Sequence, residues 1–226
     1  MRRRRPRRRR RRENRRRRGT KHNLKKQREK TMTHESNRAL CDAAQGCLVL
    51  LDIQERLARA MPAKVLSRLQ RNAQLLLRAA TALQVPVLVT QQYPQGLGPL
   101  LPELARMLPE AAPRIDKTRF SCAAVPEFRQ ALTESQRRQV VIAGMETHIC
   151  VLQTALELQR DGWTCFVMSD ATCSRQRDHY GFALERLRYA GVAVAETESA
   201  IFEWLRDAAH PAFKEMSALI QAKETA

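Results

Sequence analysis

The sequence predicts an α/β fold: a three-layer, doubly wound (Rossmann-like) parallel sheet with helices on both faces. Short apolar runs rich in β-branched residues alternate along the chain with longer segments of helical apolar spacing. Such runs are typical of strands that are buried on both faces, as in parallel sheets. Right-handed crossovers then distribute the helices over both faces. The roughly 195 residues that follow Thr31 fit one domain of ordinary size.

The first half of this domain contains two predicted strands and one long predicted helix. Residues 47–51 form the first strand. A helix follows Pro62, because apolar residues recur every three or four positions as far as Ala80. Residues 85–90 form the second strand, since its proline lies near the start, where a missing N–H matters least. The Gly- and Pro-rich residues 93–99 then predict a loop.

The second half repeats the alternation of helix and strand as far as the C-terminal helices. The predicted strands there are 140–143, 163–168 and 192–194. The predicted helices there are 126–132, 150–161, 178–189, 199–206 and 211–221. Gly162 and Gly191 end two of these helices, as glycine commonly does just beyond a helix C-terminus.

The net charge of +18 is concentrated at the N-terminus. Residues 1–31 hold fifteen Arg and four Lys against two Glu, whereas residues 32–226 hold 22 basic and 21 acidic side chains. Residues 1–31 are therefore expected to be a disordered Arg-rich tail, and Met32 is a second candidate for the translation start. Such a tail would bind nucleic-acid phosphates without sequence preference. The nearly neutral remainder argues against a nucleic-acid-binding domain.

The cysteines and the apolar runs indicate the expected cellular location of the protein. Six cysteines are scattered without a CxxC pair or a zinc-type Cys/His spacing. No apolar region follows the N-terminal charges, as a secretory signal peptide would require. We therefore expect reduced thiols and a cytoplasmic location. No apolar run approaches the length of a membrane span, so no membrane partner is expected.

Cys150 lies where an α/β protein usually binds its ligand. An apolar strand ends at Gly144, and Cys150 follows at the start of a helical segment. The free N–H groups and positive potential of a helix N-terminus favour a thiolate over a thiol. Cys150 is therefore a candidate nucleophile. The alternative is a buried structural cysteine, because free cysteines are often small core residues.

Two charged residues are suited to assist that cysteine. Asp52 and Lys117 come from two other strand ends and can converge with Cys150. A carboxylate can take the thiol proton, and an ammonium beside them stabilises both anions. The alternatives are a turn-capping carboxylate for Asp52 and a solvated surface charge for Lys117. No GxGxxG or GxxxxGK[ST] sequence occurs, so no nucleotide or other cofactor is expected.

Three segments, in the same order and at similar spacing, resemble the motifs of the isochorismatase-like (cysteine hydrolase) family. These are Leu51–Gln54, Asp116–Ser121 and Gly144–Val151. Two further segments resemble the metal-free isochorismatase-domain proteins of unassigned substrate, namely Gln91–Gly98 and His210–Glu215. The resemblance covers residues from about 46 to 222 and identifies 32–226 as an isochorismatase-like hydrolase domain.

The resemblance implies roles for individual residues. Asp52 is implied to be the general base, Lys117 the catalytic lysine and Cys150 the nucleophile. The family also implies a cis peptide bond between Met145 and Glu146, which would aim the Glu146 N–H beside the Cys150 N–H as an oxyanion hole. His148, two residues before the cysteine, is interpreted as a structural or pocket-rim residue rather than a base.

Metal binding is not expected. Nicotinamidases of this fold carry a metal site of one aspartate and two histidines between the first and second motifs. The segment Thr90–Ile115 of this chain contains neither Asp nor His.

The resemblance implies hydrolysis of a C–N bond in a small amide, carbamoyl or ureido compound through a thioester. True isochorismatases usually lack the cysteine, so Cys150 favours this chemistry over vinyl-ether hydrolysis. Family members usually form dimers or larger assemblies, so a homo-oligomer is expected. Two alternatives remain open: a non-catalytic isochorismatase-domain interaction protein, and nucleic-acid binding through the tail. The candidate pocket residues are Gln54, Gln92, Tyr93 and Phe120.

Overall fold

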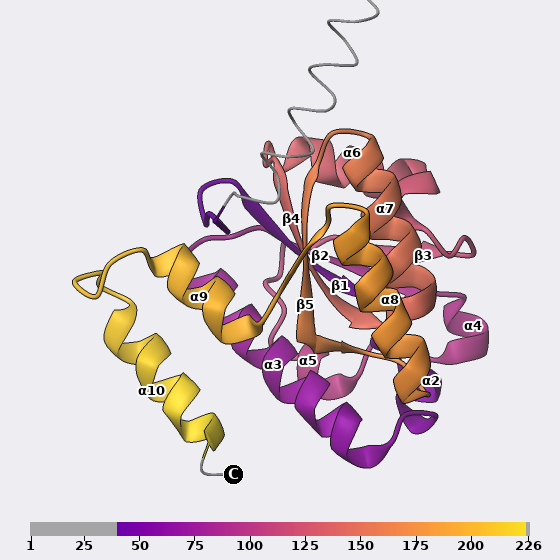
Figure 1. The fold of residues 1–226 in the computed structure, drawn as a ribbon, viewed down its shortest axis with the longest axis horizontal. Coiled ribbons are helices and arrows are strands. Elements are labelled where there is room, and N and C mark those ends of the chain that lie inside the picture. Colours follow the sequence, from indigo (N-terminus) through magenta and orange to yellow (C-terminus); the bar gives the residue numbers. More distant parts are fainter. Residues whose placement is uncertain (1–39, 225–226) are drawn as a thin grey trace, which may run out of the picture.

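The fold is a six-stranded parallel sheet with helices on both faces, which confirms the predicted fold class (Figure 1). The computed structural model of the chain describes residues 40–224, so the predicted tail at 1–31 and the domain start at residue 32 lie outside the described residues. The strand order is β3-β2-β1-β4-β5-β6. The strands are β1 (Gly46–Leu51), β2 (Val87–Gln92), β3 (Arg114–Lys117), β4 (Gln139–Met145), β5 (Thr164–Cys173) and β6 (Ala193–Ala195).

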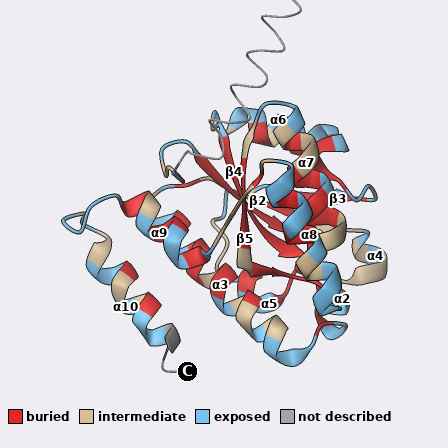
Figure 2. Ribbon diagram, viewed as in Figure 1, coloured by how far each residue is buried: buried red, intermediate tan, exposed pale blue. Residues whose placement is uncertain are grey.

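The helices divide into two layers. The longer ones are α3 (Ala63–Ala82), α6 (Pro126–Glu134), α7 (Leu152–Arg160), α8 (Arg177–Tyr189), α9 (Thr197–Leu205) and α10 (Phe213–Glu224). Residues of α3, α9 and α10 pack with one face of the sheet, whereas residues of α6, α7 and α8 pack with the other. Side chains of β1 alternate between the two, with Leu48 and Leu50 in the first core and Val49 and Leu51 in the second. The central strands are therefore buried on both sides (Figure 2).

Short elements account for most differences from the sequence-based expectation. These are α2 (Glu55–Arg59), α4 (Pro94–Leu97), α5 (Pro102–Ala105), the 3₁₀ turn Cys122–Ala124 and the π-helical turn Thr147–Val151. Each is too short to show a helical period in sequence. The strand β3 was predicted only as a strand end at Lys117, without bounds, because it is only four residues long and two of them are exposed.

Strand β5 is longer than predicted. Polar residues at Ser169 and Asp170 were expected to end it, but it continues to Cys173. Their side chains have partners that make the continuation possible. Ser169 Oγ donates to Ala195 O at 3.0 Å, and Asp170 Oδ1 accepts from the Thr197 N–H at 2.9 Å. The prediction of a strand end at this point was therefore wrong.

The strand order reverses at the centre of the sheet. The chain runs outward from β1 through β2 to β3, and then returns to place β4 on the other side of β1. Ligands of doubly wound sheets bind at such a reversal point, outside the carboxyl ends of the strands. Asp52 follows β1 there, and the segment that leads to Cys150 follows β4.

Gly144 permits the close approach of β4 to β1 at this point. Its φ is +136°, a value that side chains other than glycine rarely adopt. A Cβ at Gly144 would lie 2.0 Å from the carbonyl oxygen of Leu51, the residue before Asp52. Only glycine therefore fits between the two strand ends.

We predict that Gly144→Ala lowers the free energy of unfolding by about 3 kcal/mol or more, because it combines backbone strain with a clash against main-chain atoms. Urea denaturation followed by circular dichroism measures this. Gly181→Ala is the control, since nothing lies within 4 Å of the Cβ it adds in α8. It should be neutral or stabilising by about 0.5–1 kcal/mol. Equal effects of the two substitutions would contradict this account of Gly144.

Candidate active site

Asp52 presents a fully buried carboxylate at the end of β1. Its φ of 53° lies in the left-handed region, which Asp tolerates better than most residues. Thr90 of β2 makes two hydrogen bonds to Asp52. The Asp52 N–H donates to Thr90 O at 3.1 Å, and Thr90 Oγ1 donates to Asp52 Oδ1 at 2.7 Å. Asp52 Oδ2 faces Lys117 Nζ at 2.7 Å. The carboxylate is thus an interior ion-pair partner rather than a turn cap.

Lys117 reaches this carboxylate from two strands away. It is the last residue of β3, and its side chain passes the end of β2 to meet the end of β1. Both charged side chains have no exposed surface, which excludes a solvated surface lysine. Nζ donates to Asp52 Oδ2 (2.7 Å), Gln92 Oε1 (2.6 Å), Arg119 O (3.1 Å) and Phe120 O (3.3 Å).

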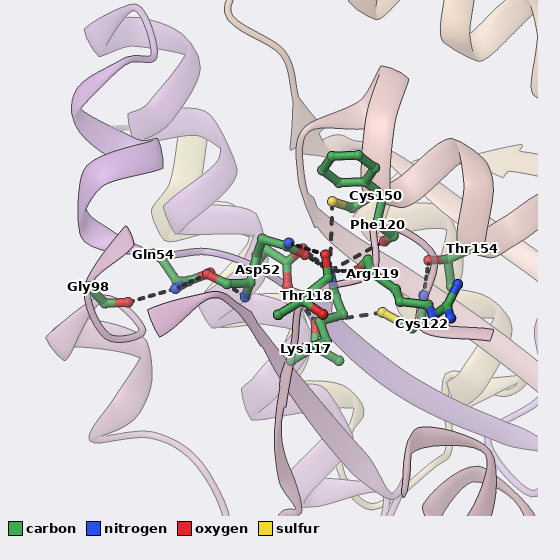
Figure 3. A network of polar contacts seen from close by, with 12 residues as sticks. Asp52, Gln54, Gly98, Lys117, Thr118, Arg119, Phe120, Cys122, Cys150 and Thr154 are labelled. Carbon is green, nitrogen blue, oxygen red and sulfur yellow. Dashed lines mark hydrogen bonds and ion pairs between the residues drawn. The ribbon is translucent and has the colours of Figure 1, made fainter. Parts of the chain in front are cut away.

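Cys150 completes the group. It lies in the π-helical turn between β4 and α7, and its Sγ is 3.8 Å from Lys117 Nζ (Figure 3). Cys150 is 5% exposed, whereas the other five cysteines are 1% exposed or less. The structure therefore brings Asp52, Lys117 and Cys150 together at the carboxyl edge of the sheet. Cys150 is also the thiol with the most access to solvent.

The electrostatics of Cys150 differ from the sequence-based expectation of a lowered thiol pKa. Burial raises the pKa of Cys150, and the negative charge of Asp52 raises it further. The Lys117 ammonium lowers it, but by less than these two effects together. The expected direction was therefore wrong, because helix position and the lysine were considered without the burial of the thiol and without the neighbouring carboxylate. The thiol of Cys150 therefore stays protonated at neutral pH, near the Asp52 carboxylate.

Lys117 keeps its charge although it is buried. Burial alone would lower the pKa of Lys117, but the Asp52 carboxylate and the nearby thiols of Cys122 and Cys150 together outweigh that effect. The net pKa of Lys117 is raised above its ordinary value. The ammonium is therefore a fixed positive charge at neutral pH.

The segment between β4 and Cys150 has the backbone that the resemblance implies. The Met145–Glu146 peptide bond is cis. The Glu146 side chain is buried and directed to the loop after β5, where its Oε2 accepts from Arg175 N at 3.0 Å and from Arg175 Nε at 3.1 Å. The carboxylate of Glu146 is thus occupied by Arg175.

His148 contacts the loop after β5 and the start of α8. Its Nδ1 lies 2.9 Å from Ser174 Oγ, and its ring centroid is 4.6 Å from that of His179. Burial and the charges of His179 and Arg175 outweigh the effect of Glu146, so the pKa of His148 is lowered. These contacts fit the structural interpretation of His148.

The four candidate pocket residues have different surroundings. Gln54 is fully buried, and its amide is bonded to the main chain of Gln92 and Gly98, so it is not available to a ligand without losing those bonds. Gln92 is bonded to Lys117. Tyr93 and Phe120 are each 54% exposed. Of the four, these two aromatic side chains present free surface near the site.

Sequence reasoning missed two residues that contact the site. Thr90 orients the Asp52 carboxylate, and its place at the end of a predicted strand was a usable signal. Cys122 is fully buried, with its Sγ 3.8 Å from Thr90 Oγ1 and its N–H donating to Thr154 Oγ1 at 3.0 Å. No local sequence pattern indicated it, because its 3₁₀ turn is three residues long.

Residues 40–224 show neither a metal-binding cluster nor a membrane-spanning helix. In that part of the chain, His, Cys, Asp and Glu form no group of three or more that could hold a metal ion. No helix there is both long and apolar enough to cross a membrane.

The fold and the site define a doubly wound α/β protein with a cysteine, an aspartate and a lysine at its reversal point. The model of the Isochorismatase domain matches residues 46–199, and the chain belongs to the isochorismatase family. A relative from Phytophthora sojae, the secreted isochorismatase effector Isc1, is 44% identical over 148 residues, which are 63% of this chain and 70% of that protein.

Two other relatives match over more of the chain. Isochorismatase domain-containing protein 2A of Mus musculus is 38% identical over 175 residues, which are 77% of this chain and 82% of that protein. The solved structure of the MAR1 ribonuclease from Caenorhabditis elegans superposes with a TM-score of 0.76 at 33% identity. It covers 81% of this chain and 93% of its own.

We predict that iodoacetamide labels Cys150 first among the six cysteines, because it is the most exposed and has Asp52 and Lys117 beside it. The labelling rate should still be rising above pH 9, since the pKa of Cys150 is raised above its ordinary value of 9.0. Peptide mass spectrometry measures both, with Cys150→Ser as the control. Labelling of Cys41 or Cys122 while Cys150 stays intact would contradict the assignment, and a rate that levels off below pH 8 would contradict the raised pKa.

Proposed function

We propose that the protein is a cysteine hydrolase that cleaves a C–N bond in a small amide, carbamoyl or ureido compound. One observation carries the proposal: the Lys117 ammonium lies 2.7 Å from the Asp52 carboxylate and 3.8 Å from the Cys150 sulfur. A nucleophile, a proton acceptor and a fixed positive charge thus share one buried site. The limited exposure of Cys150 favours a small substrate.

The first half of the reaction forms a thioester. Cys150 Sγ attacks the carbonyl carbon, and its proton passes to the Asp52 carboxylate. The Lys117 ammonium stabilises the anionic sulfur during the transfer. The N–H groups of Glu146 and Cys150 are proposed to hold the oxyanion of the tetrahedral intermediate. The C–N bond then breaks, and the leaving nitrogen takes the proton from Asp52.

The second half releases the acid. Water attacks the thioester carbonyl while Asp52 accepts a proton from it. The carbon–sulfur bond breaks, and the proton returns to the sulfur. The sum is one amide and one water converted to one acid and one amine or ammonia. The enzyme regains the protonated thiol that burial and Asp52 favour at rest.

A panel of small amides and ureido acids, assayed for ammonia release, tests the proposal. We predict that the best substrate loses at least about 10³-fold in kcat/KM with Cys150→Ser or Asp52→Asn, because each removes a group that takes part in every step. Thermal unfolding of both variants serves as the folding control. Unchanged turnover by Cys150→Ser would contradict the mechanism. No turnover across a broad panel by the wild-type protein would favour the non-catalytic interaction protein.

Metal independence is a separate prediction. Turnover of any substrate from that panel should be unchanged after dialysis against EDTA and o-phenanthroline, because the proposed chemistry uses only side chains and main-chain N–H groups. Metal analysis by mass spectrometry before and after dialysis is the control. A loss of activity that returns on adding one divalent metal would overturn this prediction.

A ribonuclease is the second candidate function, since the relative from C. elegans carries that name and residues 1–31 are strongly basic. The site argues for the first candidate, because a buried thiol is suited to acyl transfer. Deleting residues 1–31 separates the two. Salt-sensitive RNA binding that is lost on deletion, together with RNA cleavage that needs Cys150, would support the second candidate. Amide hydrolysis that is unaffected by the deletion supports the first.

Two further expectations belong to the proposal. A cytoplasmic location is supported by the six cysteines, all of which are free. The P. sojae relative is named a secreted effector, and cell fractionation tests which of the two locations applies to this protein. Assembly into a homo-oligomer stays a prediction that light scattering after size-exclusion chromatography can test.

A further inference from the structure

We propose that Gln92 is a positioning residue for the Lys117 ammonium and that Gln54 holds Gln92 in place. This inference rests on the proposed function and assigns these two glutamines to the catalytic machinery rather than to the substrate pocket. Gln92 is the last residue of β2, between the ends of β1 and β3 that carry Asp52 and Lys117.

The orientation of the Gln92 amide follows from its two partners. An ammonium only donates hydrogen bonds and a main-chain carbonyl only accepts them. The oxygen of Gln92 must therefore face Lys117 Nζ, at 2.6 Å, and its nitrogen must face Thr118 O, at 2.8 Å. The amide is thus fixed at both ends, and the bond to the ammonium is of the strong, charge-assisted kind.

Gln54 holds the main chain of Gln92 as a neighbouring strand would. Its Oε1 accepts from the Gln92 N–H at 2.7 Å, and its Nε2 donates to Gln92 O at 3.0 Å. The same Nε2 donates to Gly98 O at 2.6 Å. Gln54 is itself fully buried at the start of α2, and these three bonds are partly buried. The two glutamines form a continuous chain of contacts from α2 to the catalytic ammonium.

The hydrogen bond from Lys117 Nζ to Gln92 Oε1 restricts the conformations of the lysine side chain. A lysine side chain has many rotamers, and its ammonium has three protons. The nearest acceptors are Gln92 and Asp52, followed by the carbonyls of Arg119 and Phe120, and the sulfur of Cys150 is the most distant at 3.8 Å. Gln92 therefore anchors the ammonium beside the sulfur. Because Gln92 bonds to the ammonium and not to the thiol, the proposed transfer of the thiol proton to Asp52 is unobstructed.

The test compares Gln92→Met with Gln91→Met. Gln91 is the adjacent residue and also makes two hydrogen bonds, to Asp116 Oδ1 at 3.0 Å and from the Leu100 N–H at 2.8 Å, but neither involves Lys117. The measurement is the rate of Cys150 alkylation by iodoacetamide from pH 6 to pH 10, read by peptide mass spectrometry. Thermal unfolding of each variant reports on structural damage that the two substitutions share.

We expect Gln92→Met to slow alkylation at pH 8 by about tenfold and to shift the pH profile upward, because the Lys117 ammonium loses a charge-assisted hydrogen bond that holds it beside the sulfur. Gln91→Met should match the wild type. Gln54→Met should act in the same direction, and adding it to Gln92→Met should cause less than the product of the two effects. Equal profiles for Gln92→Met and Gln91→Met would overturn the positioning role.

A reference variant distinguishes failure of the positioning role of Gln92 from failure of the proposed function. Asp52→Asn with Lys117→Met removes both buried charges together, which avoids leaving one of them unpaired. If this double variant hydrolyses the best panel substrate as fast as the wild type, the charged pair takes no part in catalysis and the proposed function fails. If the double variant loses turnover while Gln92→Met matches the wild type in alkylation, only the positioning role fails.

Discussion

The buried ion pair between Lys117 and Asp52 is the interaction on which the site depends. Two charges removed from water are stabilised only when their remaining hydrogen-bonding atoms are also paired. Thr90 Oγ1 and Gln92 Oε1 supply such partners. Because the pKa of Lys117 is raised on folding, this stabilisation is complete below the unfolded value of 10.5 and is lost as the pH rises through the folded pKa. Burial and the Asp52 carboxylate raise the pKa of Cys150 by more than the Lys117 ammonium lowers it, so the sulfur is held as a thiol.

The topology of the sheet makes this pair possible. The ends of β3, β2 and β1 lie side by side, and they carry Lys117, Gln92 and Asp52 in that order. Adjacent strands are about 4.8 Å apart, so a group on β3 must span roughly 10 Å to reach the end of β1. A lysine can do so, with its ammonium bonded on the way to the intervening Gln92. On the other side of β1, Gly144 lets β4 come close enough for Cys150 to complete the site.

Much of the fold and part of the site could be predicted from the sequence. Buried parallel strands such as β4 are continuous apolar runs, and residues at their carboxyl ends are natural candidates, which is how Cys150 was found. What could not be predicted depends on contacts between distant residues. The continuation of β5 depends on partners in and just after β6, and the raised pKa of Cys150 depends on its burial in the fold and on the nearby Asp52 carboxylate. The amide of Gln54 was assigned to the pocket because its main-chain partners are about 40 residues away in sequence.

The most direct test of the central claim is mass spectrometry of the intact protein, acid-quenched during turnover of a substrate from the amide panel. The account predicts a transient mass increase equal to the acyl part of the substrate, located on the peptide that contains Cys150 and absent from Cys150→Ser. A thioester is stable in acid long enough to be observed, and it forms before water attacks. Steady turnover with no adduct at any quench time, and with equal rates in Cys150→Ser, would contradict the account.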